Sequence, residues 1–294
     1  MNEFADQELK KVGVAISGGF IRAAAAIGVI EVLQENNVPI NVISGSSSGA
    51  IVAGAYACGK LEELKARLVN GRRRDYFRII FEPTLPRRGF LKGERNEKFF
   101  EEFVGEKTFA ETNIPLILAV TDLTEMAEVV LTEGKISKAI RACTSVPGIF
   151  VPVEHDEKVL IDGANFNTIP SEALYQHGVN YVIAVYVAKP PSPITRFLGF
   201  IHQVRGGRLL IKKINDRQVR KQHLNIFRLI VRAVRLSVVH IKNFYHEAYR
   251  YDVIIRPELK RIRRYQVKSV EYCIAQGRRS ALEVLPQIKK DLGL

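Results

Sequence analysis

Apolar residues recur along the chain in short runs and in longer helix-like segments, and the two lengths predict an alternation of strands and helices. The short runs have the length of buried strands and lie at 11–16, 39–43, 115–123, 128–132, 159–161, 180–187 and 251–257. The longer segments lie at 23–33, 61–70, 94–104, 138–143 and 266–290. Between them, we expect the basic run at 71–77 to be a solvated surface corner and the Pro-, Gly- and Arg-rich stretch 81–93 to be a loop. The first two strands and their helices form a β-loop-α-β-turn-α unit. This order predicts an α/β fold whose parallel sheet is covered by helices.

The pattern contains no internal repeat and no domain boundary, so we expect one domain over residues 1–294. The composition changes at residue 194, and the region 194–294 is basic and rich in apolar residues. Within it, Arg228, Arg232 and Arg235 recur in steps of four and three, which places them on one face of a helix. Such a helix can lie on an anionic membrane or can pack on the core as a surface helix. The pattern leaves both interpretations open.

Composition and charge narrow the classes of partner and the cellular compartment. A hydrophobic content of 47% and a charged content of 26% are typical of a globular chain and exclude disorder. The net charge of +13 favours anionic partners, either nucleic acid or a lipid surface. The first ten residues are polar and acidic, unlike a signal peptide, and no apolar run is long enough to span a membrane. Three scattered cysteines fit a reducing compartment, so we expect a cytoplasmic protein.

One turn between a strand and a helix carries the pattern G-x-S-x-G. It consists of Gly45, Ser46, Ser47, Ser48 and Gly49. A sharp turn of this kind exposes the hydroxyl of Ser47 above a helix N-terminus, and glycine reduces crowding and strain on either side. The pattern therefore predicts a nucleophile. The alternative is a connection rich in serine and glycine whose serine caps the helix.

Two further loops could supply the other parts of a hydrolytic site. Residues 17–22 contain Gly18 and Gly19 before a helix, without the spacing of a dinucleotide or P-loop motif. Consecutive N–H groups there could form an oxyanion hole, with the charge of Arg22 nearby, although a structural turn with a surface arginine fits equally well. Asp162 follows a short strand and precedes Gly163. It is either a well-placed carboxylate or an Asx-type turn.

Taken together, these stretches resemble the bacterial patatin-like phospholipases over about residues 10–188. Four motifs occur in the family's order. They are the oxyanion loop at 18–22, the nucleophile turn at 45–49, the central segments at 119–123 and 139–150, and the Asp-Gly-Ala motif at 162–164. Two positions depart from the family pattern. Phe20 replaces a glycine of the oxyanion loop, and Ala23 replaces a glycine that often follows the arginine. If residue 20 requires positive φ, a phenylalanine there is strained.

The resemblance implies a three-layer α/β/α patatin-like fold with a mostly parallel central sheet, and a serine lipid acyl hydrolase. Ser47 would be the nucleophile and Asp162 the general base, with no histidine between them. Gly18, Gly19, Phe20 and Arg22 would form the oxyanion hole. The implied substrate is a lipid or phospholipid reached from an anionic membrane surface, with no metal or other cofactor. The location would then be cytoplasmic or peripheral at the inner face of the membrane.

Three alternatives remain open beside the dyad. An α/β-hydrolase triad would need a histidine after Asp162, and the candidates are His177, His202, His223, His240 and His246. A catalytically weak lipid-binding protein would explain Phe20 and the basic second half. A nucleic-acid-binding protein is disfavoured, because the basic residues occur without a recognised binding motif. For membrane docking, we expect the segment 194–251, where Phe197 and Leu198 lie among many arginines and lysines.

Overall fold

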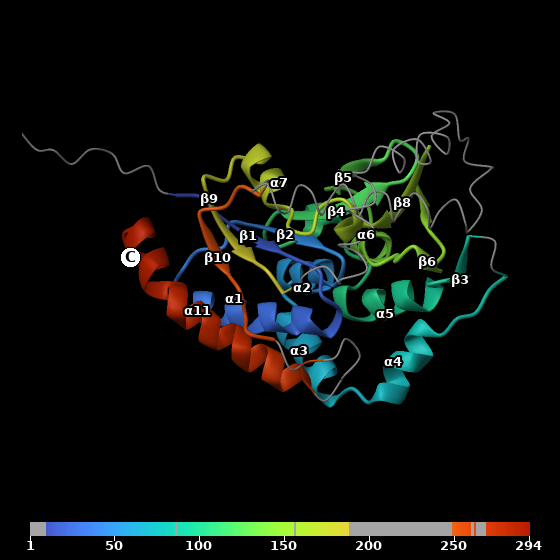
Figure 1. Ribbon diagram of the computed structural model, residues 1–294, viewed down its shortest axis with the longest axis horizontal. Helices are drawn as coiled ribbons and strands as arrows, with labels where there is room; N and C mark the ends of the chain where they lie inside the picture. The colour runs from blue at the N-terminus through green and yellow to red at the C-terminus, as the bar shows by residue number, and fades with distance from the viewer. Residues whose placement is uncertain (1–9, 86–87, 156, 188–248, 260–261, 263–268) are drawn as a thin grey trace, which may run out of the picture.

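The computed structural model describes residues 10–85, 88–155, 157–187, 249–259, 262 and 269–294 (Figure 1). A mixed, eight-stranded sheet forms its centre, with strand order β10-β9-β1-β2-β4-β8-β7 and with β5 paired to β4. The bounds are β1 Val12–Ile16, β2 Val42–Ser46, β4 Leu116–Asp122, β5 Ala127–Leu131, β7 Val153–His155, β8 Lys158–Asp162, β9 Tyr181–Val185 and β10 Val253–Ile255. All pairs from β10 to β4 are parallel, whereas β5, β8 and β7 pair antiparallel. The predicted α/β class with a mostly parallel sheet is therefore confirmed.

Helices cover both faces of this sheet and produce three layers. Helix α7 lies on one side, and α1, α2, α3 and α11 lie on the other (Figure 1). The helices are α1 Ala25–Glu35, α2 Ser48–Ala57, α3 Leu61–Asn70, α4 Arg73–Ile80, α5 Glu94–Val104, α6 Ile136–Cys143, α7 Ser171–Gln176 and α11 Val270–Leu292. Short 3₁₀ turns occupy Phe20–Ala24, Phe109–Glu111 and Gly163–Asn165, and a separate ribbon pairs β3 Gly89–Leu91 with β6 Gly148–Phe150.

Strand β1 shows why the sheet is buried on both faces. All five of its residues are buried, as expected of a continuous apolar run in a parallel sheet. Val14 belongs to the large core beneath α1, α2 and α11, whereas Ala15 belongs to the smaller core beneath α7. Side chains of successive strand residues point to opposite faces, so one strand contributes to both cores.

Helices α1 and α11 cross at a very short distance, although they are more than 230 residues apart in the sequence. A Cβ on Gly277 would lie 1.9 Å from the carbonyl oxygen of Ala25, and one on Gly28 would lie 2.1 Å from that of Ile274. Only glycine fits at either position. The described part of the carboxyl-terminal region thus packs onto the first helix of the sheet unit.

The structure corrects three details of the predicted elements. The second strand is not 39–43, because parallel pairing with β1 and β4 continues through Gly45 and Ser46. The basic run at 71–77, expected as a solvated corner, begins helix α4. The expected loop 81–93 contains β3, which pairs with β6.

The predicted basic helix at 226–236 lies outside the described residues, as does most of the expected docking segment 194–251. Within the part of the chain that is described, no helix combines the length and the apolar character needed to span a bilayer.

Candidate active site

The register of β4 brings the ends of β2 and β8 together. Val120 pairs with both β5 and β8, and Ala119 pairs with both β5 and β2. A strand has two edges, so β2 and β8 share the edge opposite β5. Ser46 stands opposite Ala119 and Asp162 opposite Val120. Because β2 runs parallel and β8 antiparallel to β4, their carboxyl ends meet, and Ser47 arrives beside Asp162.

Ser47 itself carries the backbone strain of the turn. Its φ of 53° and ψ of −132° are rare for a residue with a side chain, and such a conformation costs about 1–3 kcal/mol. The two glycines of the motif have no positive φ, so they are required for space. A Cβ on Gly49 would lie 2.5 Å from the carbonyl oxygen of Ile16, and one on Gly45 would lie 2.8 Å from the backbone of Ala50. The turn therefore fits tightly against β1 and leaves the Ser47 side chain half-buried at the amino end of α2.

The carboxylate of Asp162 contacts the Ser47 hydroxyl directly. Ser47 Oγ donates to Asp162 Oδ2 at 2.7 Å, and the Ala164 N–H donates to Asp162 Oδ1 at 2.9 Å. The first distance lies within the range expected for a nucleophile and its base. The second bond is the Asx-type turn that the sequence offered as an alternative, so both interpretations of Asp162 hold at once.

Strand β4 and the loop after α6 hold the Asp162 backbone in place. The Asp162 N–H donates to the Ser145 carbonyl at 3.0 Å, and Thr121 Oγ1 donates to the Asp162 carbonyl at 3.1 Å. Sequence reasoning did not identify Thr121 or Ser145 as supporting residues. The role of Thr121 depends on the register of β8 against β4, and that of Ser145 on how the loop after α6 packs beside β8. No local motif encodes either.

Burial raises the pKa of Asp162 toward the range that suits a general base near neutral pH. The side chain is only 4% exposed, and this desolvation raises its pKa to about 6, although the bonds from Ser47 and Ala164 act in the opposite direction. At pH 7 the group is still mostly ionised. A carboxylate with this pKa is a stronger proton acceptor than an ordinary aspartate and remains charged at physiological pH.

The glycine loop lies directly against the nucleophile. A Cβ on Gly18 would lie 2.5 Å from Ser47 Cβ and 3.1 Å from Ser47 Oγ. The Gly18 N–H finds no acceptor in the described part of the chain. The Gly19 N–H, which we expected to point toward the reacting atoms, donates to Ser48 Oγ at 2.9 Å. The structure thus leaves Gly18 as the better-placed oxyanion donor and assigns Ser48 a supporting contact that the sequence did not suggest.

Phe20 and Arg22 differ from the simple oxyanion arrangement. Phe20 has a φ of 55°, so the positive φ that a glycine would tolerate is indeed present at the position where this chain has a phenylalanine. Arg22 is buried and Nη2 donates to the Leu259 carbonyl at 3.1 Å. It was expected beside the oxyanion pocket or on the surface. The observed bond instead ties it to the segment after β10, and a role in the oxyanion hole stays a prediction.

Of the five histidines considered for a triad, His177 lies in the described part of the chain, and the hydrogen bond of its ring is not to Ser47. His177 Nδ1 lies 2.7 Å from the carbonyl of Ala173, one turn earlier on α7. His202, His223, His240 and His246 lie outside the described residues. Within the described ranges, the hydrogen bond of Ser47 Oγ goes to Asp162. The same residues contain no group of three side chains that could hold a metal ion.

Comparison with known sequences identifies the family. The family model described as Patatin-like phospholipase matches residues 14–175, more than half of the 294 residues. The chain belongs to the patatin-like phospholipase family. The matched range includes Ser47, Asp162, the nucleophile turn and the predicted oxyanion loop.

Individual relatives of this patatin-like chain are longer proteins. An uncharacterized NTE family protein of Mycobacterium tuberculosis, Rv1063c, is 31% identical over 175 residues, which cover 60% of this chain and 48% of the relative. Lysophospholipase NTE1 of Candida glabrata is 24% identical over 259 residues, which cover 85% of this chain and 14% of that protein. Among solved structures, VipD from Legionella pneumophila aligns with a TM-score of 0.48 at 12% identity, covering 95% of this chain and 67% of VipD. The chain spans about half the length of the first relatives.

Proposed function

We propose that this protein is a serine lipid acyl hydrolase that cleaves fatty-acyl ester bonds through Ser47 and Asp162. The observation that carries the proposal is the 2.7 Å hydrogen bond between a strained, turn-borne serine and a buried carboxylate. Strained backbone conformations and perturbed pKa values both cluster at functional sites, and this pair combines the two. Membership of the patatin-like phospholipase family supports the same conclusion.

The reaction would proceed in two halves through an acyl-enzyme. Asp162 Oδ2 accepts the proton of Ser47 Oγ as that oxygen attacks the ester carbonyl carbon. Collapse of the tetrahedral intermediate breaks the bond to the alcohol, which leaves with the proton from Asp162. A water molecule then attacks the acyl-enzyme while Asp162 again accepts a proton. Release of the fatty acid regenerates the Ser47 hydroxyl, so that one ester and one water give one acid and one alcohol.

The negative charge of the intermediate would develop beside Gly18 and the first turn of α2. The Gly18 N–H supplies one donor, and the amino end of α2 adds positive potential because its first N–H groups have no partners within the helix. Removing one such donor typically reduces kcat about 100- to 1000-fold. The close contact between Gly18 and Ser47 gives this donor a fixed position relative to the attacking oxygen.

The substrate class that we propose is a lipid ester, with phospholipids and lysophospholipids as the first candidates. The family's description as phospholipases supports this choice, and so does the printed name of the relative Lysophospholipase NTE1, which applies to that protein. A net charge of +13 fits an anionic lipid surface. We expect no cofactor to be required.

Hydrolysis of p-nitrophenyl esters by the purified protein tests the proposal. Ser47→Ala should reduce the rate at least about 1000-fold, since it removes the nucleophile. Ser280→Ala is a matched control, because Ser280 is a buried serine on α11. Turnover by Ser47→Ala at the wild-type rate would exclude Ser47 as the nucleophile.

A second candidate, a lipid-binding protein with weak catalysis, is favoured by the oxyanion loop. The Gly19 N–H is already bound to Ser48, and Phe20 occupies a position with positive φ. Saturable lipid binding without measurable turnover of any ester would favour this candidate. Turnover that depends on Ser47 would reject it.

A further inference from the structure

Large apolar side chains that remain exposed gather on one edge of the molecule. Among the described residues, six of the nine lie at 77–90 and 149, namely Phe77, Ile80, Phe81, Leu85, Phe90 and Ile149. We call these six the α4–β3 apolar surface. Phe77 is 59% exposed and Leu85 is 72% exposed, so neither contributes to the core. Helix α4 and strand β3 lie at the side of the molecule remote from the carboxyl terminus of α11 (Figure 1).

The outer face of α4 combines aromatic and basic residues. Arg74, Phe77, Arg78 and Phe81 follow the spacing i, i+3, i+4 and i+7, which places them on one face, and all four are exposed. The rings of Phe77 and Phe81 stack with centroids 4.8 Å apart. The opposite face anchors the helix, because the Tyr76 hydroxyl donates to the carbonyl of Arg67. The aromatic face is therefore held outward.

The β3–β6 ribbon extends this surface toward the active site. Gly89 pairs with Gly148 and Leu91 with Phe150 in parallel register, so Phe90 and Ile149 stand level and share one face. Both are exposed, at 55% and 39%. Ile149 follows Ser145 by four residues, and the Ser145 carbonyl accepts the N–H of Asp162. The apolar surface thus connects to the backbone that holds the proposed base.

The charge around this surface selects its partner. Residues 72–98 contain nine Lys or Arg and four Asp or Glu, an excess of five positive charges in a chain whose total is +13. A second copy of the chain docking here would bring two basic surfaces together. An anionic bilayer would satisfy both features, since the phenylalanines enter the interface while Arg74 and Arg78 reach lipid phosphates.

We propose that the α4–β3 apolar surface docks the protein on anionic phospholipid bilayers and presents the site of Ser47 to them. The proposal rests on the lipid hydrolase function for its purpose, although the docking itself can be measured separately. It places docking on residues other than 194–251, the segment that the sequence had suggested.

Vesicle co-sedimentation with the double variant Phe77→Ser/Phe81→Ser tests this surface. The vesicles are phosphatidylcholine alone, and phosphatidylcholine mixed with phosphatidylglycerol in equal parts. Wild type should sediment with the mixed vesicles and be released by salt. Losing two half-exposed phenylalanines should weaken that binding about 10- to 100-fold. Arg74→Gln should weaken binding to mixed vesicles about fivefold and leave binding to phosphatidylcholine unchanged.

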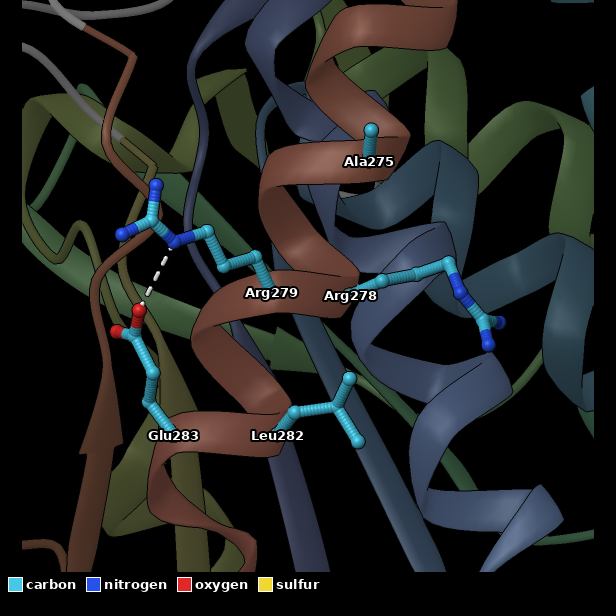
Figure 2. Close-up of a pocket in the computed structure, with 5 residues that line it drawn as sticks. All are labelled: Ala275, Arg278, Arg279, Leu282 and Glu283. Carbon is cyan, nitrogen blue, oxygen red and sulfur yellow. Dashed lines mark hydrogen bonds and ion pairs between the residues drawn. The ribbon is translucent and has the colours of Figure 1, made fainter.

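Helix α11 offers the matched control. Leu282 is 51% exposed beside Arg278, Arg279 and Glu283, and Figure 2 shows these side chains on one stretch of the helix. The arginines there are paired: Arg279 Nε donates to Glu283 at 3.0 Å, and Arg278 binds both Glu31 and Glu35. Leu282→Ser therefore removes an exposed apolar side chain from a charge-balanced surface. It should leave vesicle binding unchanged.

The activity readout separates failure of docking from failure of the hydrolase proposal. On the same preparations, the ratio of hydrolysis of mixed vesicles to hydrolysis of water-soluble p-nitrophenyl acetate should fall with Phe77→Ser/Phe81→Ser. Thermal unfolding confirms that each variant is folded. If the double variant binds vesicles as well as wild type does, the docking proposal is overturned. It is also overturned if the wild-type protein binds no vesicles and instead forms a dimer that Phe77→Ser/Phe81→Ser disrupts. If the wild-type protein hydrolyses no ester but still binds vesicles in a way that depends on Phe77 and Phe81, the hydrolase proposal is rejected and the docking proposal is supported.

Discussion

Replacing Asp162 with asparagine should stabilise the folded protein at neutral pH while it abolishes catalysis. Asp162 is only 4% exposed and has a pKa of about 6, because burial penalises its charge. An aspartate in an unfolded chain titrates near about 3.9. Asparagine has nearly the same shape and carries no charge. It can still accept the Ala164 N–H bond through its carbonyl oxygen.

The expected magnitude follows from the difference between the two pKa values. In the folded protein, Asp162 keeps its proton up to about pH 6, whereas in the unfolded chain it loses the proton near about pH 3.9. The free energy of unfolding of the wild-type protein is therefore greatest below about pH 3.9 and falls as the pH rises to about 6. About two pH units correspond to about 3 kcal/mol of charge burial above pH 6. The opposing bonds from Ser47 and Ala164 are already part of the pKa of about 6, so they are not subtracted again. Asp162→Asn should therefore be about 3 kcal/mol more stable than wild type at pH 8.

Urea unfolding followed by circular dichroism at pH 4, 6 and 8 measures this difference. The advantage of Asp162→Asn should shrink to well under about 1 kcal/mol near pH 4, where the wild-type carboxyl is protonated in the folded state and about half protonated in the unfolded state. Glu133→Gln is the control, because Glu133 is exposed and its neutralisation should change little. A variant that is less stable than wild type at pH 8, or a difference independent of pH, would refute the assignment of Asp162 as a charge held at a cost in stability.

Three further outcomes follow from the same geometry. The value of kcat/KM should fall about tenfold between pH 7 and pH 5 as Asp162 gains its proton, and a flat profile would contradict its role as base. Gly18→Ala should reduce ester hydrolysis at least about 100-fold, because its Cβ would lie 2.5 Å from Ser47 Cβ; unchanged kinetics would show that this loop is not part of the site. Gly277→Ala should destabilise the fold by about 1–3 kcal/mol in urea unfolding, since its Cβ would lie 1.9 Å from a carbonyl of α1. An unchanged midpoint would contradict that packing.

The sequence predicted the frame of the fold because its signals are local. The buried strand that became β1 and the helix at 61–70 depend on continuous patterns that neighbouring elements do not override. The nucleophile turn was also local, since glycines at 45 and 49 admit the close backbone contacts that the structure shows.

The residues that support Asp162 and the partner of Arg22 could not be predicted, because they depend on how distant segments pair and pack. The sequence of a single strand or loop does not encode that. Thr121 supports Asp162 because β8 pairs with β4 at one register, and Ser145 because the loop after α6 lies beside the end of β8. Arg22 is directed to Leu259, from a segment that lies 237 residues further along the chain. The solvated corner at 71–77 became a helix because Tyr76 finds partners on α3.

The most direct test of the central claim is covalent labelling with a fluorophosphonate. Such a reagent phosphonylates a serine that a neighbouring base activates. Peptide mass spectrometry of the labelled wild-type protein should place the adduct on Ser47, and both Ser47→Ala and Asp162→Asn should lose it. An adduct on another serine, or labelling of Ser47 that persists at the wild-type rate in Asp162→Asn, would contradict the dyad.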